Sequence, residues 1–218
     1  MNLLDMHQVL SILEMIGVVA FSISGAMVAI DKKLDLFGVI FVSVMTSLGG
    51  GVTRDILIGK LPPQMFENYK CIAISVTTSI LVFIVVYVTR EYYRKNVKTI
   101  ETINNVFDAI GLGVFSIFGI QIAINTGFGY NKFLLVFLGM ITGVGGGLIR
   151  DIIVGRTPMI FSKYIYAVAA ILGGISYLIC QALGTSEGIS TMAGILVIFV
   201  IRMLSTYYKW NLPKIPLK

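Results

Sequence analysis

The stretch that decides the fold occurs twice, as TSLGGGVTRDI at residues 46–56 and as TGVGGGLIRDI at residues 142–152. A second pair of segments agrees upstream of each copy, EMIGVVAFSISG at residues 14–25 and DAIGLGVFSIFG at residues 108–119. The second copy follows the first by 94 residues in the upstream segments and by 96 residues in the glycine segments. The second copy therefore has two additional residues between its two segments. Two segments that agree in the same order and at nearly the same spacing indicate an internal duplication.

The composition indicates a protein that is surrounded by lipid. Hydrophobic residues make up 56% of the chain and charged residues only 13%, and the mean hydropathy is +0.90. A water-soluble domain carries about a quarter charged residues, because its surface must be solvated. Cys71 and Cys180 lie in apolar runs and are expected to be packing residues. A single His and the lack of a Cys/His cluster argue against a structural metal site, and no cofactor is expected.

Seven segments are apolar enough and long enough, at about 20 residues, to cross the hydrocarbon core of a bilayer. We expect an all-α integral membrane protein with these spans: Val9–Ile30, Phe37–Ile58, Cys71–Thr89, Asn105–Ile124, Phe133–Gly155, Tyr164–Leu183 and Gly188–Ser205.

Each copy of the duplication holds three spans, and three is an odd number, so the second copy enters the membrane from the opposite side. The prediction is therefore two inverted three-helix repeats followed by one extra helix. The corresponding division is residues 1–90 for the first repeat, 91–104 for a cytoplasmic loop, 105–183 for the second repeat, and 184–218 for the seventh helix with a basic cytoplasmic tail.

The distribution of Lys and Arg between the loops predicts the orientation, since cytoplasmic loops carry the excess. With the N-terminus outside and the C-terminus inside, three cations fall outside: Lys60, Lys70 and Lys132. Twelve fall inside: Lys32, Lys33, Arg90, Arg94, Lys95, Lys98, Arg156, Lys163, Arg202, Lys209, Lys214 and Lys218. The net charge of +6 is thus a topology signal that favours anionic phospholipid headgroups, and it does not indicate a nucleic-acid partner.

The glycine triplets, Gly49–Gly51 and Gly145–Gly147, leave the backbone uncovered inside apolar spans. Exposed backbone at membrane depth is tolerated only against protein or water. Two readings stay open for the triplets alone: a bend that faces an aqueous path, or close packing of two helices through small residues.

Ionisable residues within spans are costly in lipid and usually line a pathway or pair with each other. Adjacent residues point about 100° apart on a helix, so we expect Arg54 not to pair with Asp55, nor Arg150 with Asp151. By depth, the predicted contacts are Glu14 with Arg54 and Asp108 with Arg150, which leaves Asp55 and Asp151 to face water or a counter-ion.

Four acids against two bases inside the spans favour cations in a hydrated path. Hydroxyl groups repeated in both copies are candidate supports for such a path, and singly each is more often bonded back to its own helix. They are Ser22, Thr46, Ser116 and Thr142.

Two GGGxxRD motifs in seven spans with inverted repeats resemble the prokaryotic branch of the trimeric intracellular cation (TRIC) channels, whose bacterial relatives are also described as glycine-transporter domain proteins. The resemblance implies a homotrimer in the cell membrane, with a pore in each protomer that passes K⁺ and other monovalent cations. It also implies that the second and fifth spans kink at their glycines and line the pore together with Arg54, Asp55, Arg150 and Asp151.

A secondary transporter of glycine or a similar small solute is the alternative, because inverted repeats with broken helices suit carriers equally well. An enzyme is not expected, since the chain contains no phosphate loop, zinc-protease motif or serine-hydrolase elbow.

Overall fold

The computed structural model describes residues 3–67, 69–162 and 165–210, and all the regular structure in these ranges is helical. The long helices are α1 (Leu3–Asp31), α2 (Leu36–Leu57), α4 (Lys70–Val88), α6 (Val97–Ala123), α7 (Lys132–Ile153), α9 (Ala167–Ala182) and α10 (Glu187–Tyr207). Short elements join them: α3 (Gln64–Glu67), α5 (Arg90–Lys95), the π-helical turn η1 (Ile124–Phe128) and α8 (Met159–Ser162).

The duplication is visible in how the helices begin and end. Asp35 caps α2 by accepting a bond from the main-chain N–H of Gly38, and Asn131 caps α7 by accepting one from Leu134. Such caps satisfy N–H groups that the first helical turn leaves without partners. After each helix the chain turns at a glycine with positive φ, at 72° for Gly59 and 66° for Gly155.

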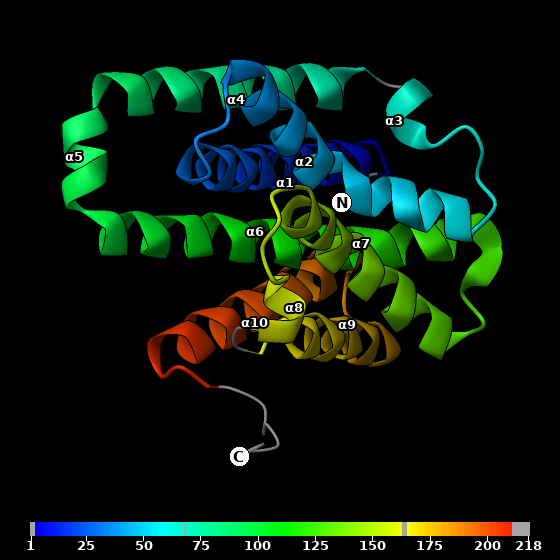
Figure 1. Cartoon of the computed structure of the whole chain (residues 1–218). Coiled ribbons are helices and arrows are strands. Elements are labelled where there is room, and N and C mark those ends of the chain that lie inside the picture. Colours follow the sequence, from blue (N-terminus) through cyan, green and yellow to red (C-terminus); the bar gives the residue numbers. More distant parts are fainter. Residues whose placement is uncertain (1–2, 68, 163–164, 211–218) are drawn as a thin grey trace, which may run out of the picture.

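The two copies pack around each other with α1 against α6 and α2 against α7 (Figure 1). Phe21 and Phe115, which correspond in the duplication, stack with ring centroids 5.4 Å apart. Gly17 lies against Phe115 and Gly111 lies against Phe21, so these contacts exchange under a two-fold rotation. The predicted inverted repeats are therefore confirmed.

The outer helices complete the bundle in the same symmetric way. The α4 helix packs on α1 and α2, and α9 packs on α6 and α7. The extra helix, α10, packs on α6 and α9 and runs antiparallel to α6, since Gln121 meets Thr191 at one end and Asp108 meets Arg202 at the other. No helix in the described part of the first copy corresponds to α10.

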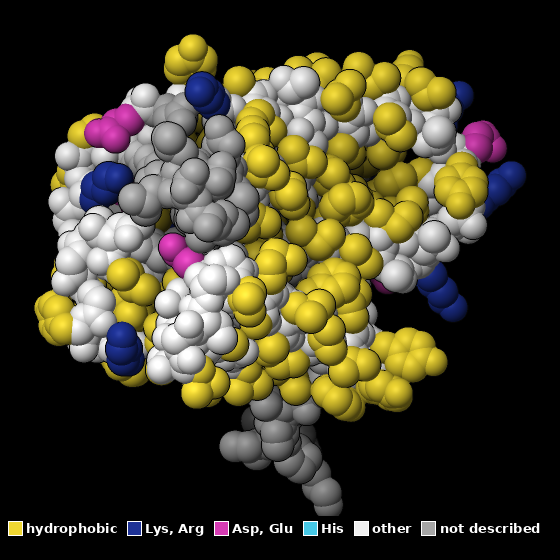
Figure 2. All heavy atoms as spheres, turned by 180° about the vertical axis from the view of Figure 1, so that it is seen from behind, with side chains coloured by type: hydrophobic (Ala, Val, Ile, Leu, Met, Phe, Trp, Pro, Cys, Tyr) yellow, Lys and Arg dark blue, Asp and Glu magenta, His cyan; other side chains and the backbone are white. Residues whose placement is uncertain are grey.

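The surface is that of a protein in lipid. Large apolar side chains gather over the middle and right of the face seen in Figure 2, and charged side chains lie toward its edges. The α4 helix turns Ser75 and Ser79 inward while Leu81, Ile84 and Val85 are exposed, which reverses the pattern of a water-soluble helix.

Two expectations about the elements need correction. Six helices of the described chain are long and apolar enough to cross a membrane, whereas α9 has only 16 residues, so it spans about 24 Å at 1.5 Å per residue. Its expected start at Tyr164 lies outside the described residues. The segment 91–104 is not an irregular loop: α5 and the first turns of α6 occupy it. The basic tail over 211–218, with Lys214 and Lys218, and Lys163 also lie outside the described residues.

Candidate functional site: one glycine crossing and two arginine sites

The glycine triplets form the crossing point of α2 and α7. A Cβ atom on Gly50 would collide with the carbonyl oxygen of Thr142, and one on Gly146 would collide with the carbonyl oxygen of Thr46. A Cβ on Gly145 would stand 3.1 Å from the Cα of Gly50. Each triplet thus gives the backbone of the other copy room to approach, which is the packing use of small residues in membranes.

The predicted kinks do not interrupt the helices. Helical structure continues through Gly49–Gly51 in α2 and through Gly145–Gly147 in α7. Of the two readings left open by the sequence, the described arrangement shows close helix packing. The main-chain groups at the triplets stay hydrogen-bonded within their own helices, so no water is needed to satisfy them.

The repeated hydroxyl groups serve the helices around this crossing. Thr46 and Thr142 each donate to the carbonyl four residues earlier, at 2.6 Å in both cases. Ser22 donates to Val18 and also contacts the Ser75 hydroxyl at 2.9 Å. Ser116 is fully buried and its hydroxyl has no partner among the described residues. The corresponding serines therefore differ in their bonding, although the threonines do not.

We use the name Arg54 site for Glu14, Arg54, Asp55, Gln64 and Cys71. The guanidinium of Arg54 donates to Asp55 Oδ1 from Nε at 2.9 Å and from Nη2 at 2.7 Å. The expectation that these neighbours would not pair is wrong. The long Arg54 side chain reaches around the helix, while the main-chain N–H of Gln64 holds Asp55 Oδ2 at 2.9 Å and so fixes the carboxylate near the guanidinium.

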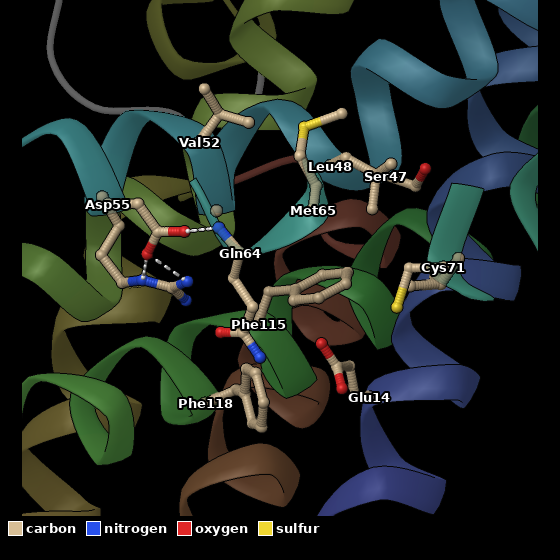
Figure 3. Close-up of a pocket in the computed structure, with 13 residues that line it drawn as sticks. Glu14, Ser47, Leu48, Val52, Asp55, Gln64, Met65, Cys71, Phe115 and Phe118 are labelled. Atoms are coloured by element: carbon tan, nitrogen blue, oxygen red, sulfur yellow. Dashed lines mark hydrogen bonds and ion pairs between the residues drawn. The ribbon is translucent and has the colours of Figure 1, made fainter. Parts of the chain in front are cut away.

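A cavity of about 40 Å³ opens beside this pair (Figure 3). Its lining includes Glu14 from α1, Cys71 from α4 and Phe115 and Phe118 from α6. The carboxylate of Glu14 and the sulfur of Cys71 point toward one another across it. No ion pair joins Glu14 to Arg54 in the described part of the chain, so that predicted contact is not formed.

We use the name Arg150 site for Ser24, Asp108, Arg150, Asp151, Arg156, Met159, Tyr166 and Arg202. Arg150 donates to Asp108 at 2.9 Å, to Asp151 at 2.8 Å and to the Ser24 hydroxyl at 2.7 Å. The predicted contact between Asp108 and Arg150 is present. The Arg150 and Asp108 side chains have no exposed surface, so this is a buried ion pair with several hydrogen bonds.

Asp55 and Asp151 face arginine counter-ions and not water, which is the second of the two predicted alternatives. Both carboxylates are buried, with exposed fractions of 1% and 0%. Asp151 accepts from Arg150, from Arg156 at 2.7 Å and from the main-chain N–H of Met159 at 2.9 Å. The main-chain bond from Met159 corresponds to the bond that Gln64 donates to Asp55. Each aspartate therefore binds the first main-chain N–H of the short element that follows its helix: Asp55 binds α3, and Asp151 binds α8.

Arg202 was placed among the cytoplasmic loop cations, and the structure corrects this. It lies in α10, has no exposed surface, and its guanidinium carbon is 4.6 Å from the centre of the Tyr166 ring. Its Nη2 is 3.7 Å from Asp108 Oδ2. The count of four acids against two bases therefore omits Arg202. The sequence signal for this position is a single Arg inside the apolar run ILVIFVIRML, a pattern that is typical of an intramembrane residue.

The arrangement does not suit a bound metal. The described residues contain no group of three or more His, Cys, Asp or Glu side chains close enough to hold one. The two sites share one arrangement. At each end of the glycine crossing an arginine pairs with an aspartate, and a further carboxylate lies nearby, that of Glu14 from α1 at the Arg54 site and that of Asp108 from α6 at the Arg150 site.

Comparisons with known proteins agree with this architecture. The family described as Glycine transporter matches residues 11–89 and 105–182, which are the two repeats. The membrane protein YvgT of Bacillus subtilis is 34% identical over 202 residues, covering 93% of this chain and 94% of that protein. The inner membrane protein YadS of Escherichia coli strain K12 is 32% identical, covering 92% and 93% of the two chains.

Solved structures agree as well. One described as a prokaryotic TRIC channel in 0.5 M KCl has a TM-score of 0.82 and 36% identity, covering 94% of this chain and all of that one. Another, from work on conductance through TRIC cation channels, has a TM-score of 0.80 and 34% identity, covering 95% and 98%. These relatives are channels and not enzymes. The chain is a multi-pass protein of the cell membrane, and it belongs to the Glycine transporter family, in the branch of the prokaryotic TRIC channels.

Proposed function

We propose that this protein is a cation channel that passes K⁺ and other monovalent cations, assembled as a homotrimer with a conduction path in each protomer. The observation that carries the proposal is the match to prokaryotic TRIC cation channels over almost the whole length of both chains. The cavity at the Arg54 site supports it, because Glu14 offers a carboxylate to a cation at one end of the bundle.

The proposed path runs along α2 and α7 past the glycine crossing, from the Arg54 site to the Arg150 site. In this proposal the Arg54 site faces outside and the Arg150 site faces the cytoplasm, following the excess of loop cations on one side. The described arrangement is a closed one, since the crossing brings backbone against backbone and the Arg150 site is fully packed. Opening then requires α2 and α7 to move apart at their triplets, which gives the glycines, Arg54, Asp55, Arg150 and Asp151 a role in gating.

Recording from purified protein in planar bilayers with symmetric KCl tests the proposal. We expect discrete unitary K⁺ currents, on the order of picoamperes, because a hydrated path passes ions far faster than a carrier that must change conformation for each solute. Protein carrying Gly146→Leu is a poor control because it is expected not to fold, so empty liposomes and heat-denatured protein serve as controls. Absence of unitary currents from folded protein would contradict the proposal.

A carrier for glycine is the second candidate, because the family that matches both repeats carries the description of a glycine transporter. Inverted three-helix repeats are common in carriers with alternating access. Uptake of labelled glycine into proteoliposomes discriminates the two functions. Saturable uptake without unitary currents would favour the carrier, whereas unitary K⁺ currents without glycine uptake favour the channel.

A further inference from the structure

Among the described residues three arginines are buried, and Arg202 is the one that the duplication does not supply. It lies on α10, for which the first copy has no counterpart, and it reaches into the Arg150 site from the side of α6. Its guanidinium lies over the face of Tyr166 and next to the far oxygen of Asp108, at 3.7 Å. The Arg150 site therefore contains a charged side chain that has no counterpart at the Arg54 site.

Arg202 is held differently from Arg150. Arg150 donates hydrogen bonds to two carboxylates and a hydroxyl, whereas no nitrogen of the Arg202 guanidinium has a hydrogen-bond partner in the described part of the chain. Asp108 Oδ2 and the Tyr166 hydroxyl also have none. A buried guanidinium without directional bonds is held only by charge and by stacking on the aromatic ring. Arg202 is thus the least firmly bound charge of the Arg150 site.

The two sites also differ in the sign of their charge. At the Arg150 site three guanidinium groups, from Arg150, Arg156 and Arg202, meet two carboxylates, from Asp108 and Asp151. At the Arg54 site one guanidinium pairs with the carboxylate of Asp55, and the carboxylate of Glu14 lines the same cavity without an ion pair. Unbalanced charge acts strongly where water is scarce. A cation that crosses both sites would be attracted at the first and repelled at the second.

We propose that Arg202 is a specificity-determining residue of the conduction path, which keeps the Arg150 site positively charged and sets the barrier that K⁺ meets there. This rests on the proposed function, since it assumes that cations pass the Arg150 site. Without Arg202 the remaining charges of the site balance, with two guanidinium groups against two carboxylates, and the repulsion is removed. Because Arg202 comes from α10, the helix outside the repeat controls one end of the path only.

The test compares single-channel currents of Arg202→Gln with those of the unmodified protein in planar bilayers. We expect the unitary K⁺ conductance to rise by roughly threefold or more, since removal of one poorly screened charge lowers a Coulomb barrier by that order. In a KCl gradient the reversal potential should shift toward the K⁺ equilibrium potential. Arg202→Lys keeps the charge but loses the stacking on Tyr166, so its conductance and reversal potential should lie closer to those of the unmodified protein than to those of Arg202→Gln.

Ser205→Ala is the matched control for packing, because Ser205 is buried on the same helix and its hydroxyl donates to the Arg202 carbonyl. It should leave conductance and reversal potential unchanged. A change of equal size in Ser205→Ala and in Arg202→Gln would show that a disturbed α10, not charge, is responsible, and would overturn the proposal.

The failures of the two proposals are distinguishable. If the unmodified protein gives no K⁺ current, the proposed function fails. If it conducts and Arg202→Gln conducts equally, with the same reversal potential, the role of Arg202 is overturned. Should Arg202→Gln not purify as folded protein, Arg202→Met provides the same comparison, because an apolar side chain of similar volume is often tolerated in place of a buried charge.

Discussion

The first copy of the motif leaves Arg54 with one carboxylate partner beside a small cavity, whereas the second copy surrounds Arg150 with two carboxylates, a hydroxyl and a thioether. The motif residues are the same and the helices are related by a two-fold rotation. The difference comes from residues outside the motif: aspartate in place of glutamate on the partner helix, Tyr166 in place of Cys71, and α10. A duplicated motif can therefore form one open and one closed site.

Substitutions at the glycine crossing should have the largest effect on folding, because both copies of the motif pack against each other there. Gly50→Leu and Gly146→Leu should each prevent folding, since the new side chain meets a carbonyl of the opposite helix that cannot yield as a flexible side chain does. Overpacking of this kind costs about 1–3 kcal/mol and more where backbone is the obstacle. The yield of monodisperse protein measures the effect.

Gly51→Ala is the control for the crossing. The nearest atom to a Cβ there is Arg54 Nη2 at 3.7 Å, an ordinary contact distance, so the alanine variant should fold normally. Folded, thermally stable Gly50→Leu protein would contradict the packing role of the triplets and restore the reading in which they face an open path.

The two arginines should differ in their contribution to stability. Arg150→Gln removes the partner of Asp108 and Asp151 in a fully buried site, which costs about 3–5 kcal/mol. Arg54→Gln leaves Asp55 with its bond from Gln64 and next to a cavity that water can enter, so about 1–3 kcal/mol is expected. Thermal unfolding in detergent compares them, and equal losses would show that the surroundings do not distinguish the sites.

Double-mutant cycles sharpen the same comparison at the level of pairs. Asp108→Asn with Arg150→Gln should show a coupling energy of about 0.5–3 kcal/mol, because the two side chains are in contact at 2.9 Å. Glu14→Gln with Arg54→Gln should show a weaker coupling, because the two side chains line the same cavity without an ion pair. A strong coupling between Glu14 and Arg54 would mean that they pair in a state other than the described one.

The smallest effect concerns the corresponding serines. Ser22→Ala removes bonds to Val18 and Ser75 and should cost about 1 kcal/mol. Ser116→Ala removes a buried hydroxyl without a partner, so it should be neutral or slightly stabilising. The unfolding temperatures of the two variants provide the measurement, and a larger loss for Ser116→Ala would point to a partner for that hydroxyl in the assembled protein.

Sequence reasoning was effective where it depended on periodicity and repetition. The odd number of spans in each copy was enough to predict inversion, and depth along antiparallel helices was enough to place Asp108 against Arg150. Both follow from chain geometry, which the sequence carries directly. The bounds of the long helices also agree within a few residues except at the starts of α1 and α6, where polar residues obscured the helix limits.

The predictions about Arg54 and Arg202 failed for two physical reasons. Long side chains reach beyond their own position on a helix, and helices that are not adjacent in the chain pack together. The pairing of Arg54 with Asp55 depends on where Gln64 places the carboxylate, and residue directions on an ideal helix do not include that constraint. Arg202 lies within the expected span Gly188–Ser205, but it was counted with the cytoplasmic cations because it is close to the cytoplasmic end of that span. Only the packing of α10 on α6 shows that it meets Asp108.

The reciprocal crossing of Gly50 and Gly146 has an evolutionary consequence. Each triplet accommodates the backbone of an inverted partner of nearly the same sequence. A single three-helix unit inserted in the membrane in both orientations would present the same surface to its own inverted copy, so the crossing was geometrically available to a dual-topology homodimer before any gene fusion. After fusion, neither triplet is free to diverge alone, whereas the helices and charges around it are.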